Sequence, residues 1–128
     1  MTEAASDWCE IYVKGAEDVS ALVALVATAA GGKSDGRSVM SPEGVEIYVV
    51  RNSTNPKFEP VPPSDTDFVF WPFVIDMEVD EERGVPLVAA VLRTLWTHGL
   101  WAVAACSFEA RLPRSGGFSS GRLILEDD

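Results

Sequence analysis

The chain has 128 residues, of which 47% are hydrophobic and 23% charged, and 20 acidic side chains against 10 basic ones give a net charge of −10. This composition predicts one folded domain over residues 1–128, long enough to bury a core without metals or disulfides. The charge argues against binding to nucleic acids and to anionic membranes, because both require clustered cations. It favours a basic protein partner.

The N-terminal stretch, MTEAASDWCE, is acidic and lacks the basic and apolar regions of a signal peptide. The longest apolar run, from Val19 to Ala30, is too short to cross a bilayer. We therefore expect a cytoplasmic protein in which Cys9 and Cys106 are reduced.

The first half of the chain predicts two strands and a helix. Residues 8–14 and 45–50 alternate between apolar and other side chains, which is typical of strands. Residues 15–32 carry apolar side chains at helical spacing and end in two glycines, which predicts a helix. Residues 33–44 are rich in turn formers, and residues 52–67 contain four prolines, which predicts a long, stiff loop.

The third strand is predicted at Phe68–Asp80, where every odd position is apolar. The even positions begin with aromatic residues, Phe68 and Phe70, and end with acidic ones. Pro72 predicts a bulge or an unpaired position, because proline cannot donate a hydrogen bond to a sheet.

The rest of the chain predicts a second helix, a fourth strand and a tail. Pro86 fits the first position of the helix, and Gly99 fits its C-terminal stop. Residues 101–110 predict the strand, whose buried face is undecided because both of its registers are apolar. The C-terminal tail, residues 111–128, contains a Gly/Ser turn and a short edge strand at 122–126.

This order, β-α-β-β-α-β, predicts an α+β, ferredoxin-like domain: a four-stranded antiparallel sheet with two helices on one face. Its first and fourth strands are neighbours, so Cys9 and Cys106 could approach each other. Two buried thiols are favoured over a redox pair, because there is no Cys-x-x-Cys motif.

The other face of the sheet would combine aromatic and acidic side chains. Its candidate binding residues are Trp8, Glu10, Tyr12, Glu46, Tyr48, Asp76 and Glu78. Phe68, Phe70 and Glu109 are further candidates for this face. Three interpretations remain open: an ordinary solvated face, a surface for a cationic partner, and a homodimer of two stacked faces, in which like charges would meet.

No catalytic, metal or cofactor site is predicted, and a non-enzymatic role is favoured. Asp76 and Glu78 would lie about 6–7 Å apart on one strand face, near the spacing of an inverting glycosidase pair. Two acids on a wet strand are common, however, and adding Glu46 for a divalent cation gives no dense set of oxygens. His98, the single histidine, fits a helix-capping role.

The segment from Phe70 to Pro113 carries the pattern WPF…VD…LWTHGLWAVAACSFEARLP. It resembles small acidic proteins of high-GC Gram-positive bacteria, some of which are discussed as toxin-immunity proteins. The resemblance covers about a third of the chain and carries over no functional residues. It implies a small, non-enzymatic inhibitor of a basic toxin.

The sequence thus favours a protein-binding module of the immunity type that binds a basic partner through the acidic and aromatic sheet face. The alternative is an oligomeric small-ligand-binding or sensory domain with a pocket under the loop at 52–67.

Overall fold

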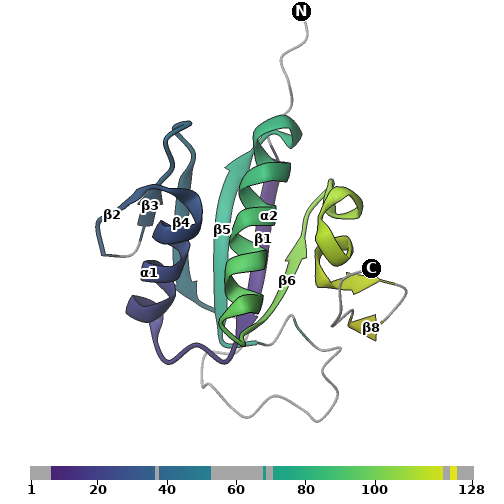
Figure 1. Ribbon diagram of the computed structural model, residues 1–128, viewed down its shortest axis with the longest axis horizontal. Coiled ribbons are helices and arrows are strands. Elements are labelled where there is room, and N and C mark those ends of the chain that lie inside the picture. Colours follow the sequence, from purple (N-terminus) through teal and green to yellow (C-terminus); the bar gives the residue numbers. More distant parts are fainter. Residues whose placement is uncertain (1–6, 37, 53–67, 69–70, 120–121, 124–128) are drawn as a thin grey trace, which may run out of the picture.

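The computed structural model describes residues 7–36, 38–52, 68, 71–119 and 122–123. It shows an α+β fold in which two helices lie on one side of an open antiparallel sheet (Figure 1). The sheet order is β2-β3-β4-β5-β1-β6. In chain order its elements are β1 (Asp7–Lys14), α1 (Val19–Ala30), β2 (Lys33–Ser34), β3 (Ser38–Met40), β4 (Glu46–Arg51), β5 (Phe73–Val79), α2 (Glu81–Thr97) and β6 (Trp101–Ala105).

The sheet has six strands where the sequence predicted four. The two additional strands, β2 and β3, come from the turn-rich segment after α1 and extend the sheet beyond β4. They are two and three residues long, too short to show a periodic pattern. The four longer strands lie in the order β6-β1-β5-β4, and every pair is antiparallel.

The helices begin at aspartate caps. The Asp18 carboxylate accepts a hydrogen bond from the Ala21 amide at 2.8 Å, and Asp80 accepts one from the Arg83 amide at 3.2 Å. The prediction that Pro86 begins the second helix was wrong, because α2 begins five residues earlier and Pro86 lies inside it. The predicted C-terminal stop is confirmed: Gly99 has a φ of 80° and the Leu100 amide bonds to the Leu95 carbonyl.

The core lies between the helices and one face of the sheet. Its strand residues include Ile11, Ile47 and Ile75, which are fully buried. The face of β6 that the sequence left undecided is now clear, because Ala104 lies opposite Ile11 and both belong to this core. Trp101, Val103 and Ala105 therefore point to the face opposite the helices.

The third predicted strand is shorter than expected, since β5 begins only at Phe73. Trp71 and Pro72 form a bend before it, and the Asn52 amide bonds to the Pro72 carbonyl at 2.8 Å. The tail strand predicted at 122–126 is present at β8 (Arg122–Leu123), which pairs with β7 (Phe118–Ser119) in a separate small sheet, and residues 124–126 lie outside the described residues. The loop at 53–67 and Phe70 lie outside the described residues.

Candidate functional site

All seven residues predicted for the binding face lie on the side of the sheet opposite the helices. The strand register places Glu10 beside Asp76, Trp8 beside Glu78 and Asp76 beside Tyr48. Glu46 and Tyr12 alternate with core residues and so point the same way. Glu109, a further candidate, is not on this face, because it lies in a turn after β6 where its carboxylate accepts a hydrogen bond from the Cys106 amide.

The four exposed large hydrophobic side chains of the described residues all lie on this face. They are Trp8, Met40, Tyr48 and Val50, with exposed fractions of 55%, 47%, 40% and 37%. Met40 belongs to the face because it lies opposite Glu46 in the β3–β4 register, and Val50 because it lies opposite Val74. Sequence reasoning missed Met40, since β3 itself was not predicted.

One part of the face, here called the acidic end, is open to solvent and mostly anionic. It comprises Trp8, Glu10, Met40, Glu46, Tyr48, Asp76 and Glu78. Within it, the Tyr48 hydroxyl donates a 2.7 Å hydrogen bond to Glu46 Oε1, which raises the pKa of the tyrosine. Among the described strands, this face also carries Lys33 on the outermost strand and Lys14 at the far end.

Glu10 and Asp76 form a like-charged pair across neighbouring strands. Partial burial, the charge of Glu10 and a hydrogen bond with Glu10 raise the pKa of Asp76 to about 6. The Oδ1 atom of Asp76 is buried and has no hydrogen-bond partner. A carboxylate beside another resists ionisation, so Asp76 favours keeping its proton or receiving a cation.

The other part of the face, here called the tryptophan end, is covered by the chain itself. It comprises Lys14, Phe68, Trp71, Val74, Trp101 and Val103. The rings of Trp71 and Trp101 meet edge to face at 6.1 Å, and Lys14 Nζ lies 5.5 Å and 4.7 Å from their centroids. Trp71 is fully buried, as its odd position predicted, but on the face opposite the helices and not on the helix side to which that position assigned it.

Tyr12 lies at the boundary between the two ends. Its ring packs edge to face against Phe68 at 5.3 Å, so Phe68 covers part of the face as predicted, although from outside β5. Burial and then the charges of Glu10 and Asp76 raise the pKa of Tyr12.

Both edges of the sheet are protected against further strand pairing. On one side the edge strand β2 has only two residues. On the other side, the turns of Pro113–Gly117 pack along β6. A Cβ on Gly117 would lie 2.6 Å from the Ala102 carbonyl oxygen, and one on Gly116 3.0 Å from that of Ala104. A partner would therefore meet the face more readily than an edge.

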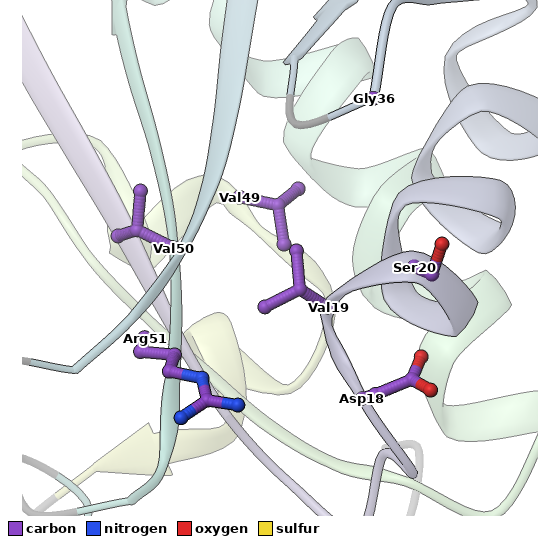
Figure 2. Close-up of a pocket in the computed structure, with 7 residues that line it drawn as sticks. All are labelled: Asp18, Val19, Ser20, Gly36, Val49, Val50 and Arg51. Atoms are coloured by element: carbon purple, nitrogen blue, oxygen red, sulfur yellow. The ribbon is translucent and has the colours of Figure 1, made fainter.

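A separate pocket of about 620 Å³ lies between the start of α1 and the end of β4 (Figure 2). Val19 and Val49 point toward each other, with Arg51 on one side and Asp18 on the other. The pocket predicted under the loop at 52–67 falls largely outside the described residues. The pocket in Figure 2 borders the end of β4 that leads into this loop.

The described residues contain no group of three or more His, Cys, Asp or Glu side chains placed to hold a metal ion. His98 caps α2, with its Nδ1 2.8 Å from the Thr94 carbonyl oxygen, as the sequence predicted. Within the same part of the chain, no helix is long and apolar enough to span a membrane.

Comparisons with protein families, with curated proteins and with solved structures give no match to this chain. The resemblance to small acidic immunity-type proteins therefore remains a prediction from the sequence.

Proposed function

We propose that the protein is a non-enzymatic binding module whose acidic end docks a basic protein partner. The observation that carries this proposal is the clustering of the exposed large hydrophobic side chains on the one sheet face that also holds Glu10, Glu46, Asp76 and Glu78. Clustered apolar groups rimmed by charge are a feature of protein interaction sites.

Electrostatics specify the chemistry of the partner. The Glu10–Asp76 pair is repulsive in the isolated chain, and an incoming lysine or arginine would convert that repulsion into attraction. Trp8 and Tyr48 would supply the aromatic contact area typical of interface anchors. The net charge of −10 would accelerate encounter with a basic protein.

Two other partners are disfavoured on the same electrostatic grounds. A homodimer of stacked acidic ends would place carboxylates against carboxylates, and a nucleic acid would place phosphates there. An immunity-type inhibitor of a basic toxin, acting in the cytoplasm, is the specific form that the sequence resemblance supports. A ferredoxin-like relationship for the central strands is supported by their order, β6-β1-β5-β4.

A small-ligand or sensory role is the second candidate, and the pocket in Figure 2 favours it. Its volume of about 620 Å³ lies within the ordinary range for ligand sites. Its lining of three valines, Ser20, Gly36, Asp18 and Arg51 would suit a small zwitterion. In that case amino acids screened singly would raise the melting temperature, and a change at the exposed lining residue, Arg51→Ala, would abolish the rise.

The primary test is affinity capture from a lysate of the source cell at low and high salt, with three baits. These are the wild-type chain, a face variant with Glu10, Glu46 and Glu78 changed to Gln, and a control variant with Glu17, Glu43 and Glu82 changed to Gln. The control glutamates are exposed and belong to other surfaces, so both variants lose the same charge.

The proposal predicts a basic protein that the wild-type and control baits retain at low salt and the face variant releases. Binding by the purified partner should then weaken at least tenfold for the face variant alone. Equal capture by all three baits, or none by any, would contradict the proposal.

A further inference from the structure

We propose that Cys9 and Cys106 are a redox site: they close into a reversible intramolecular disulfide on exposure to a small disulfide oxidant such as oxidised glutathione. This inference is independent of the acidic end, because it concerns the helix side of the sheet. Both residues are thiols in the structure.

The strand register brings the two cysteines together. In the antiparallel β1–β6 pair, Ile11 lies opposite Ala104 and Glu10 opposite Ala105. The pairing stops there because β6 ends at Ala105, and the same register continued by one residue would set Cys106 opposite Cys9. Alternation in β1 puts Cys9 on the same face as Ile11, and Cys106 packs against the core that contains both residues, so both cysteines lie on the helix side.

Burial agrees with this placement. Cys9 is a fully buried member of the main core, and Cys106 is partly buried and packs against the same core. The two cysteines are 97 positions apart in the sequence, but the pairing of β1 with β6 brings their parts of the chain side by side.

The geometry suits a disulfide after a small adjustment. Residues directly opposite in antiparallel strands have Cα atoms about 4.5–5.5 Å apart, within the range of about 4.4–6.8 Å seen in disulfides. Their Cβ atoms must approach by roughly 1 Å. Cys106 can supply this movement because it lies at a bend one residue past the end of β6.

The difference in exposure sets the order of the reaction. The Cys106 thiolate, which solvent reaches, attacks one sulfur of oxidised glutathione and releases the first glutathione thiolate. The buried Cys9 thiolate then attacks Cys106 Sγ, breaks the mixed disulfide and releases the second. The two protons lost by the cysteines end on the two glutathiones, so two protein thiols are oxidised as one glutathione disulfide is reduced.

Closure would attach the edge strand β6 covalently to the centre of the sheet. Disulfides that close long loops stabilise most, because they remove most freedom from the unfolded chain. We expect the melting temperature of the oxidised chain to exceed that of the reduced chain by on the order of 10 °C.

The test equilibrates the folded full-length chain with glutathione buffers of increasing oxidised fraction. Remaining thiols are blocked with N-ethylmaleimide in denaturant, and the mass is measured without reductant. The expected product is a monomer that has lost two hydrogen atoms, contains a Cys9–Cys106 linked peptide and takes up no maleimide. Dithiothreitol should restore both maleimide sites.

The matched control is Cys106→Ser, which replaces the more exposed cysteine and should melt at the same temperature with and without oxidant. If this variant does not fold, the mass measurement on the wild-type chain is sufficient to test the proposal. Three results would overturn the proposal: two thiols still open to maleimide, a stable glutathione adduct on Cys106 without closure, or a disulfide formed only between two chains.

Discussion

The two ends of the sheet face opposite the helices have different environments. At the tryptophan end, Trp71 and Phe68 fold back over the strands, so Trp71 is fully buried. At the acidic end, Trp8 is more than half exposed although it occupies the same face of the same sheet. Both ends contain aromatic rings, so hydrophobicity alone does not explain the difference.

The difference in charge between the two ends explains their difference in burial. A neutral aromatic cluster gains free energy when the chain covers it, and Lys14 fits over the indole rings with its ammonium group. Covering the acidic end with neutral residues would strip water from Glu10, Glu46 and Glu78 without returning a counter-charge. An uncovered acidic surface of this kind is stable in water and is complementary to a cationic partner.

The largest expected difference between the two ends is in the free energy of unfolding when a tryptophan is removed from each. Trp71→Ala should lower the free energy of unfolding by about 3–5 kcal/mol, because it empties a buried site. Trp8→Ala should change it by less than about 0.5 kcal/mol, because that ring is mainly in water. Urea denaturation of both variants measures the difference, and similar losses would mean that the acidic end is also covered.

Asn52→Ala should have the next largest effect. Asn52 is buried, and its Nδ2 donates a 2.6 Å hydrogen bond to the Trp71 carbonyl, which ties the end of β4 to the bend over the face. Its loss should cost about 1–3 kcal/mol of unfolding free energy and shift the tryptophan fluorescence. Ser41→Ala removes another buried hydrogen bond, which the Ser41 hydroxyl oxygen accepts from the Val45 amide, and should leave the fluorescence unchanged.

Asp76→Asn should stabilise the protein at neutral pH. The pKa of Asp76 is raised from 3.8 to about 6, so the folded chain holds this proton more tightly than the unfolded chain. The resulting stability is fully present below pH 3.8 and is lost as the pH rises through about 6. The variant avoids that loss, and allowing for solvent screening we expect a gain of about 1–2 kcal/mol above pH 6.

Thermal or urea unfolding across this pH range checks the sign. The difference between Asp76→Asn and the wild type should grow between pH 3.8 and about 6 and then level off. Glu78→Gln, which removes an exposed charge from the same strand, should show a difference below about 0.5 kcal/mol. If Asp76→Asn instead loses stability relative to the wild type as the pH rises, the Asp76 carboxylate must be stabilised by an unrecognised cation.

The smallest effect is expected for Tyr48→Phe. The hydroxyl that it removes bonds to Glu46 on the exposed surface, so the free energy of unfolding should change by less than about 0.5 kcal/mol. If the acidic end is a docking surface, the same variant should weaken partner binding measurably while the fold is unchanged. An unaltered affinity would place Tyr48 outside the contact.

The sequence predicted correctly those strands in which apolar and polar side chains alternate regularly. The alternation of residues 8–14 and 45–50 identified β1 and β4 and placed Glu10, Tyr12, Glu46 and Tyr48 on the correct face. The acids of β5 followed for the same reason.

The remaining features depend on contacts distant in sequence. Trp71 changes face because the chain bends before β5, which the odd–even pattern of the strand cannot reveal. The inner face of β6 is selected by its pairing with β1, and β3 is too short to be recognised alone. Sequence patterns therefore placed the acids on the face opposite the helices but did not predict the tryptophan end beside them, nor Met40.

A carbon-13 NMR titration of the Asp76 carboxyl in the isolated wild-type chain tests most directly whether the acidic end lacks a counter-charge. The structure predicts an apparent pKa of about 6 for this carboxyl. Glu10→Gln should lower the pKa of Asp76 toward its ordinary value by removing the neighbouring charge. A pKa near 3.8 in the wild-type chain would contradict the account, because Asp76 would then be fully ionised without a cationic partner.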